Sequence, residues 1–221
     1  MKATITSLIF LLLSLTVSSQ TYKYIGIEEG LSNQKIYKIQ KDARGYMWFL
    51  THVGIDQYNG KEIKHYKLRE GNRELDPLLN INWTFLDKTG TLLVTGKQGR
   101  IFRYDSGHDR FVQIYSMYNY WNKDYHAFVR YSYIDQEDNV WLCGKSAIHL
   151  FNIESGQKQR ISNRLGNITC IEQINSEHFF IGTDKRIYLA KLENGNLKEL
   201  SCGKLGMMDM HVHELYLQDR K

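Results

Sequence analysis

The residues with the clearest chemical potential are three aspartates that recur along the chain. Asp42, Asp87 and Asp135 each follow an alternating apolar run, and Asn175 takes their place in a fourth copy. Carboxylates can serve as general acids or bases, but an aspartate also stabilises a tight turn by accepting backbone N–H groups. Because the residue returns every 40 to 48 positions, we interpret it as a structural turn residue. We predict no catalytic residue in this chain.

The aspartates belong to a repeat that predicts the fold. Each copy reads as a strand, a tight turn, a second strand, a glycine-containing loop and two further strands, which is typical of a β-propeller blade. We therefore expect an all-β propeller of four-stranded antiparallel blades, incomplete here, and no helix in the mature chain. The expected blades span residues 34–66, 79–115, 127–161 and 168–200, with the start of a fifth at 211–221. The structural repeat residues are Asp42, Gly45, Trp48, Asp87, Gly90, Asp135 and Trp141.

The composition of the 221 residues agrees with a β protein. Aromatic residues make up 13%, and proline occurs once against 17 glycines, so Gly, Asn and Asp must form the turns. The net charge of +5 is evenly spread and no nucleic-acid-binding motif is present, so we expect no nucleic-acid partner. Cys143, Cys170 and Cys202 lack metal-ligand spacing and are interpreted as small buried apolar residues. We expect neither a metal nor a cofactor, and interpret His211 and His213 as loop and strand residues.

The first twenty residues resemble a secretory signal peptide. Lys2 precedes an apolar run that ends in small residues, which predicts cleavage just before Gln20 or Thr21. The run is short for a membrane span of about 20 residues, and an uncleaved anchor is the alternative. We therefore expect an exported chain.

Four segments of the first predicted blade resemble a known family. They are Gly30-Leu31-Ser32-Asn33, residues 36–42, residues 45–49 and the run Gly54-Ile55-Asp56-Gln57-Tyr58-Asn59-Gly60. Together they look like the opening blade of the two-component regulator propeller, the periplasmic sensor region of Bacteroides-type hybrid two-component histidine kinases. The later blades match more loosely, and the fourth lacks both the turn aspartate and the tryptophan.

The resemblance implies a function for the whole receptor. Such propellers sense glycan-derived oligosaccharides on the periplasmic side of the inner membrane. The receptor adds a second propeller, a β-sandwich and a kinase that starts a phosphorelay, and it forms a dimer. Because the repeat stops just after a fifth blade begins, we expect a fragment of a longer receptor. Kinase activity then belongs to the absent part. The alternatives are an exported propeller lyase or hydrolase acting on glycans, and a stand-alone binding propeller.

One connection between predicted blades has the composition of a ligand-binding loop. Residues 116–124 are rich in aromatic side chains, which stack on sugar rings, while the amides and ammonium groups beside them bind hydroxyls or acidic groups. Lysines from loops on the same rim would suit an anionic oligosaccharide. The alternative is that the aromatic residues pack on their own blade. The candidate ligand-binding residues are Tyr118, Tyr120, Trp121, Asn122, Lys123, His52, Lys97 and Lys145.

Overall fold

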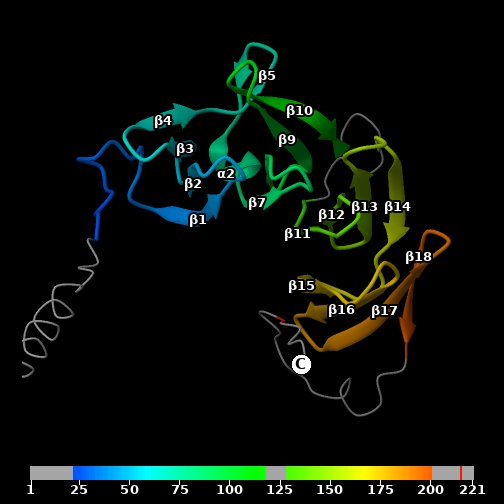
Figure 1. Ribbon diagram of the computed structural model, residues 1–221. Coiled ribbons are helices and arrows are strands. Elements are labelled where there is room, and N and C mark those ends of the chain that lie inside the picture. Colours follow the sequence, from blue (N-terminus) through cyan, green and yellow to red (C-terminus); the bar gives the residue numbers. More distant parts are fainter. Residues whose placement is uncertain (1–21, 118–127, 201–214, 216–221) are drawn as a thin grey trace, which may run out of the picture.

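The computed structural model describes residues 22–117, 128–200 and 215 (Figure 1). Four antiparallel sheets, each of four strands, follow one another in chain order. Figure 1 shows the sheets arranged along an arc, with the first strand of each sheet on the concave side. The predicted all-β architecture of four-stranded propeller blades is thereby confirmed. The predicted signal peptide, the loop residues 118–123, Cys202 and the start of a fifth blade lie outside the described residues.

The strands of each sheet occur in simple sequential order. The first sheet contains β1 (Ile36–Lys41), β2 (Met47–Thr51), β3 (Ile55–Tyr58) and β4 (Ile63–Tyr66). The second contains β7 (Trp83–Leu86), β8 (Leu92–Thr95), β9 (Arg100–Asp105) and β10 (Arg110–Ser116). The third contains β11 (Tyr131–Ile134), β12 (Asn139–Cys143), β13 (Ala147–Asn152) and β14 (Lys158–Ser162). The fourth contains β15 (Ile168–Gln173), β16 (His178–Thr183), β17 (Ile187–Glu193) and β18 (Asn196–Leu200).

The recurring aspartates hold the turn between the first and second strands. In the first sheet, Oδ1 of Asp42 accepts the backbone N–H groups of Arg44 and Tyr46 at 3.0 and 2.9 Å. Its Oδ2 accepts the indole N–H of Trp48 at 2.9 Å. One carboxylate therefore fixes both the turn and the buried tryptophan of the next strand.

The third sheet repeats this arrangement and the second varies it. Trp141 donates its indole N–H to Oδ2 of Asp135 at 2.9 Å. The second sheet has Leu93 at the tryptophan position, and Oδ2 of Asp87 instead accepts Nε of Arg103 at 2.9 Å. Each turn aspartate is buried, so a donor to its second oxygen offsets the cost of removing that oxygen from water.

The apolar cores lie between successive sheets. Trp48 is fully buried between the first two sheets, with its ring centroid 4.7 Å from that of Tyr104. Leu93 and Leu142 belong to the core between the second and third sheets. Trp141 packs between the third and fourth, against Phe179 at 4.9 Å. Stacked sheets thus bury side chains that a single sheet would leave in water.

Hydrogen bonds at the turns also join neighbouring sheets. The residue after each turn aspartate donates its backbone N–H to the next sheet. Ala43 donates to Gly90 O at 3.2 Å, Lys88 to Oδ1 of Asp138 at 3.1 Å, and Gln136 to Oε1 of Gln173 at 2.6 Å. These hydrogen bonds therefore fix the position of each sheet relative to the next at the edge that carries the aspartate turns.

The connection between the first two sheets departs from the prediction. It contains a two-stranded hairpin, β5 (Arg69–Glu70) and β6 (Arg73–Glu74), and a short helix, α2 (Pro77–Asn80). The expectation of no helix was therefore wrong. The Asp76 side chain accepts the Leu78 N–H and Pro77 opens the helix, which are helix-start signals. One turn is too short to leave an apolar period in the sequence.

Two further expectations concern the cysteines and the membrane. Cys143 and Cys170 are buried and form no disulfide, as expected of small apolar residues. In the part of the chain that the structure describes, no helix has the length and apolar character needed to cross a membrane.

Candidate functional site

Two kinds of loop form one rim of the molecule. The loops between second and third strands hydrogen-bond to the segments that lead into or out of the sheets. In the first sheet, His52 N–H donates to Lys35 O at 3.1 Å, and in the second, Gln98 N–H donates to Leu79 O at 3.2 Å. The third sheet reverses the direction, since Asn163 N–H donates to Ser146 O at 3.0 Å. The loops that carry His52, Lys97 and Lys145 therefore lie at the same end of their sheets.

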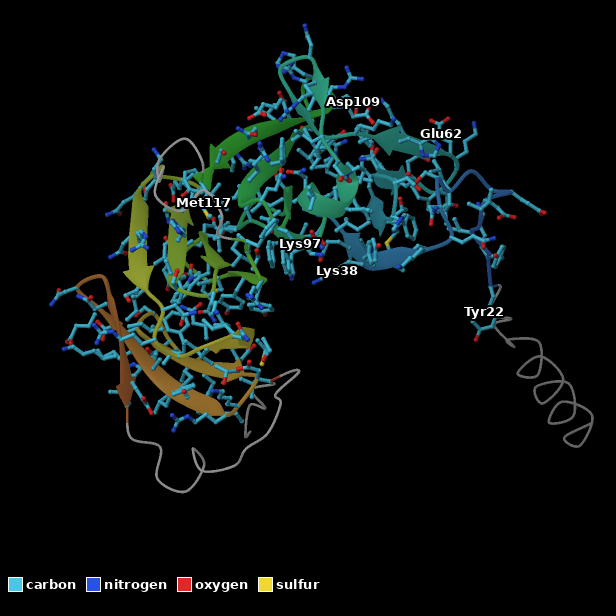
Figure 2. All side chains as sticks on the ribbon, turned by 180° about the vertical axis from the view of Figure 1, so that it is seen from behind. Tyr22, Lys38, Glu62, Lys97, Asp109 and Met117 are labelled. Carbon is cyan, nitrogen blue, oxygen red and sulfur yellow. The ribbon has the colours of Figure 1, made fainter. Side chains whose placement is uncertain are left out.

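Both flanks of the aromatic segment are attached to a single loop of the second sheet. Met117 N–H donates to Gly99 O at 3.0 Å, and Val129 N–H donates to Lys97 O at 2.9 Å. Met117 and Val129 are buried in the core between the second and third sheets. The predicted ligand-binding residues 118–123 lie outside the described residues. Figure 2 labels Met117, the last described residue before them, and Lys97, whose carbonyl oxygen accepts Val129 N–H.

The close approach at the first flank requires glycine. Gly99 has φ of +66°, and a Cβ atom at this position would lie 2.7 Å from Sδ of Met117. A side chain at residue 99 would therefore suffer both backbone strain and a clash. The glycine in this loop thus sets where the aromatic segment begins.

The structure brings two of the predicted lysines to the second flank. Lys97 accepts Val129 N–H, while Arg130 N–H donates to Cys143 O at 2.8 Å, directly before the loop that carries Lys145. The strand entering the third sheet therefore passes between the Lys97 and Lys145 loops. Both lysines are exposed. Among the described residues, neither ammonium group has a hydrogen-bond or ion-pair partner.

His52 lies on the same rim but in a separate cluster. Its Nδ1 is 2.6 Å from the Tyr37 hydroxyl, and Nζ of Lys35 lies 5.3 Å from the centroid of the Tyr37 ring. All three residues belong to the first sheet or the segment just before it. No described contact joins His52 to the Lys97 and Lys145 pair, so the structure supports two clusters on one rim.

Sequence reasoning missed one aromatic residue of this rim. Phe128 directly follows the segment 118–127, and 56% of its surface is exposed. Its carbonyl oxygen lies 3.7 Å from the position of a Cβ atom on Gly144, so its backbone is beside the Lys145 loop. Exposed aromatic faces and free ammonium groups bind sugar rings and anionic groups. Because Phe128 closes the aromatic-rich stretch of sequence, it could have been included among the candidate residues from the sequence alone.

The described residues show no arrangement suited to a metal ion. No group of three or more His, Cys, Asp or Glu side chains among them is placed to bind one. The chemistry that this rim offers comes from aromatic and cationic side chains.

The fold and rim define a protein built of β-propeller blades. The sequence model of the two-component regulator propeller matches residues 30–52, the segment that carries Gly30-Leu31-Ser32-Asn33 and the first turn. The resemblance of the opening blade to this family is thus confirmed. A search of the curated proteins found no match to the chain.

Solved structures with a similar fold include extracellular domains of bacterial proteins. The extracellular domain of the hybrid two-component system BT3049 of B. thetaiotaomicron has 17% identity and a TM-score of 0.62, over 81% of this chain and 26% of that one. The corresponding domain of BT4673 has 16% identity and a TM-score of 0.56, over 85% and 24%. PorZ, a surface component of the type-IX secretion system of Porphyromonas gingivalis, has 13% identity and a TM-score of 0.57, over 85% and 24%. The chain spans about a quarter of these relatives.

Proposed function

We propose that this chain is part of a ligand-sensing propeller in the periplasmic region of a hybrid two-component regulator. Its ligand would be a glycan-derived oligosaccharide bound at the rim, and the signal would pass to a histidine kinase outside this chain. The observation that carries the proposal is the attachment of both flanks of the aromatic segment to the loop of residues 97–99. Because both ends of the segment are hydrogen-bonded to one loop, its point of attachment to the fold is fixed, which favours a role in binding.

The chemistry of the rim favours a ligand with anionic groups. Lys97 and Lys145 flank residues 128–130 and project charge that no described residue neutralises. Phe128 adds an exposed ring beside them, and Tyr118, Tyr120 and Trp121 belong to the same connection. Aromatic faces would stack on the sugar rings, and the lysines would pair with carboxylate or sulfate groups.

The proposal extends to the rest of the receptor. We propose an exported chain with a cleaved signal peptide at 1–20, blades at 34–66, 79–115, 127–161 and 168–200, and a further blade from 211. A second propeller, a β-sandwich and the kinase would complete a dimeric receptor. The family match and the extracellular domains of similar fold support this arrangement.

A glycan array comparing the wild type with two rim variants and two control variants tests the rim. We expect Trp121→Ala and Lys97→Gln/Lys145→Gln each to lose binding of the oligosaccharides that the wild type retains. Tyr24→Ala is the matched aromatic control, since Tyr24 is 76% exposed and lies in the N-terminal segment. Lys61→Gln, in the exposed turn before β4, is the charge control. Unchanged binding in Trp121→Ala would remove the segment 118–123 from the site.

A further inference from the structure

The loops between second and third strands carry a lysine at the same position in three successive sheets. Lys97, Lys145 and Lys185 follow the last residues of β8, β12 and β16, each by two positions. All three are exposed, and among the described residues their ammonium groups have no hydrogen-bond or ion-pair partner. Val53 takes the place of the lysine in the first sheet. The repeated position therefore defines a series of cations from the second sheet to the fourth.

The connection between the third and fourth sheets adds an arginine to this series. Asn163 donates its side-chain N–H to Gly144 O at 2.8 Å, which attaches the start of the connection to the lysine loop of the third sheet. Asn167 donates its side-chain N–H to Oδ2 of Asp184 at 2.7 Å, which attaches the end of the connection to the lysine loop of the fourth sheet. Arg164 lies between the two attachments. It is exposed, and its guanidinium group has no hydrogen-bond or ion-pair partner in the described part of the chain.

The connection between the second and third sheets ends in a similar way. Val129 N–H donates to Lys97 O at 2.9 Å, and Arg130 N–H donates to Cys143 O at 2.8 Å. Arg130 is therefore held between the lysine loops of the second and third sheets. It is exposed, and no described residue forms a hydrogen bond or ion pair with its guanidinium group. The resulting cationic row consists of Lys97, Arg130, Lys145, Arg164 and Lys185.

Little negative charge accompanies the cationic row. Asp184 is the one acidic residue in the segments 96–99, 128–130, 144–146, 163–167 and 184–186. Its Oδ2 accepts the Asn167 side chain and its Oδ1 is buried, so the carboxylate is turned away from solvent. The exposed charge of these segments is therefore positive.

The opposite end of the fourth sheet has a different charge pattern. Nζ of Lys191 lies 3.2 Å from a carboxylate oxygen of Glu177 and 3.2 Å from one of Glu193. Lys198 pairs with Glu193 at 2.6 Å. The protein's own carboxylates neutralise the lysines at that end, whereas they leave the cationic row unpaired.

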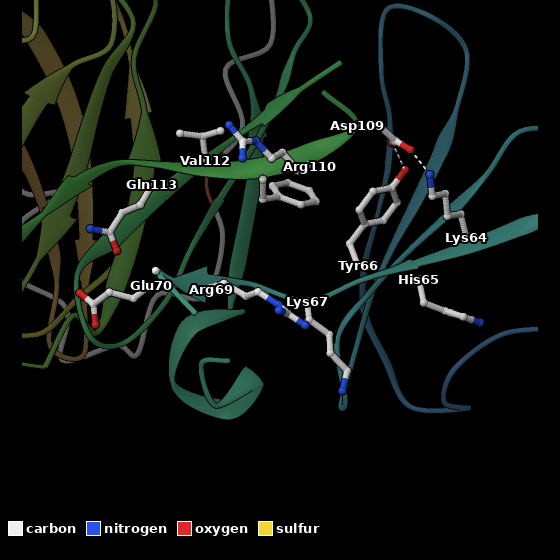
Figure 3. A pocket seen from close by; sticks show the side chains of 12 residues that line it. Lys64, His65, Tyr66, Lys67, Arg69, Glu70, Asp109, Arg110, Val112 and Gln113 are labelled. Atoms are coloured by element: carbon white, nitrogen blue, oxygen red, sulfur yellow. Dashed lines mark hydrogen bonds and ion pairs between the residues drawn. The ribbon is translucent and has the colours of Figure 1, made fainter. Parts of the chain in front are cut away.

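A groove of about 630 Å³ between β4 and β10 also contains paired lysines (Figure 3). Figure 3 marks the ion pair between Lys64 and Asp109 and the hydrogen bond from the Tyr66 hydroxyl to Asp109, which is 2.5 Å long. Lys67 pairs with Glu74 at 2.8 Å. These two lysines therefore have less positive charge to offer a ligand than the lysines of the cationic row.

We propose that the rim binds a linear acidic oligosaccharide that extends along the cationic row from the second sheet to the fourth. The inference rests on the proposed function and specifies its ligand as a chain with a carboxylate or sulfate group on successive sugars. Ammonium and guanidinium groups pair with such oxyanions. Each further cation contacts a ligand that is already held, so the affinity rises with the length of the ligand until the ligand reaches Lys185.

Isothermal titration of the full chain with sulfated isomalto-oligosaccharides, from the disaccharide to the dodecasaccharide, tests the length of the site. We expect the affinity to rise at least about tenfold over this series, and to fall as the salt concentration rises. The unsulfated oligosaccharides of the same lengths are the neutral match and should not bind. Oligogalacturonates of the same lengths supply carboxylates in place of sulfates.

A variant at the far end of the row tests its extent. Lys185→Gln should weaken binding of the dodecasaccharide at least about fivefold and leave that of the disaccharide within about twofold of the wild type. Lys185→Arg keeps the charge and should bind both as the wild type does. Lys61→Gln is the matched control, since Lys61 is exposed in the turn before β4, at the opposite end of its sheet. It should stay within about twofold of the wild type at every length.

The outcomes separate this inference from the proposed function. A wild type that binds the disaccharide but gains no affinity with length would refute the inference and leave an oligosaccharide site at the rim. Length dependence that is unchanged in Trp121→Ala would support the cationic row and remove the aromatic segment from the site. The inference is overturned if Lys185→Gln behaves as Lys61→Gln does, or if the unsulfated series binds as tightly. A single-stranded oligonucleotide of equal charge that bound as tightly would also overturn the assignment to a saccharide.

Discussion

Ser32 donates both its backbone N–H and its hydroxyl to the same oxygen of Asp56, at 2.8 and 2.9 Å. Asp56 is fully buried, and its other oxygen lies 2.8 Å from Nδ1 of His65. The two residues come from the first and last segments that resemble the propeller family. This contact fixes the chain that enters the first sheet against the third strand of that sheet.

We expect Asp56→Ala to destabilise the protein by roughly 1–3 kcal/mol, because the donors of Ser32 lose their buried acceptor. Urea unfolding followed by tryptophan fluorescence measures this change. Glu62→Ala is the control, since Glu62 is an exposed residue of the turn before β4. Equal stability of the two variants would show that the Ser32 contact contributes nothing.

We expect Trp48→Phe to cost roughly 1–3 kcal/mol of unfolding free energy, since Oδ2 of Asp42 then lacks the indole donor within the core. Phenylalanine is also smaller than tryptophan, so the loss combines the missing hydrogen bond with a small cavity. Trp83→Phe is the matched control, because Trp83 is half-buried and its indole N–H has no described acceptor. Chemical denaturation measures the unfolding free energy of both variants. A larger loss of unfolding free energy in Trp83→Phe than in Trp48→Phe would contradict the assigned role of Asp42.

We expect Gly99→Ala to be more destabilising than Gly156→Ala, although both glycines have positive φ, of +66° and +69°. An added Cβ at Gly156 meets nothing within 4 Å, whereas at Gly99 it lies 2.7 Å from Sδ of Met117. The shared backbone strain is worth about 1–2 kcal/mol, so the difference between the variants isolates the contact at the flank of the aromatic segment. Thermal unfolding measures it, and similar losses would argue against a fixed anchor there.

We expect stability to fall as the pH rises above about 9. Burial raises the pKa of the Cys143 thiol well above its usual range, and burial raises the pKa of Tyr133 to about 12. The folded state therefore keeps protons that the unfolded state releases near pH 8.5 for a thiol and near pH 10 for a tyrosine. The stabilisation is complete below those values and is lost as the pH climbs through the interval towards the folded pKa.

The contribution of the thiol can be separated by mutation. Urea unfolding at several pH values should show a shallower decline between pH 8.5 and 10 for Cys143→Ala than for the wild type. The folded wild type should also leave Cys143 unreactive towards a thiol reagent at pH 8, because the neutral thiol is a poor nucleophile. Rapid modification of Cys143 in the folded protein would contradict its burial.

The four-stranded sheets could be predicted from the sequence because each copy of the repeat combines a local turn with alternating apolar residues. Asp42 and Asp135 act within four to six residues of themselves, so their role is visible in one stretch of sequence. The hairpin β5–β6 was not predictable in this way. Its Glu70 is tied to Arg100, thirty positions later, and no local pattern encodes that contact.

The candidate sites also differ in whether local sequence or the packing of distant strands determines them. The prediction of a ligand-binding segment at 118–121 rests on aromatic density and stays a prediction, and loop order placed Lys97 and Lys145 in equivalent loops of their sheets. The groove between β4 and β10 depends on two strands of different sheets lying side by side. Such a site arises from tertiary stacking, and sequence periodicity alone carries no information about it.

The attachment of Met117 and Val129 to a single loop has a consequence for how such a protein diversifies. The two ends of the intervening segment are fixed by backbone hydrogen bonds at Gly99 and Lys97, whatever side chains lie between them. Doubling the length of a flexible loop costs only about 0.6 kcal/mol of closure entropy. Insertions and exchanges of residues can therefore accumulate between these anchors at little cost to folding, while the sheets stay the same.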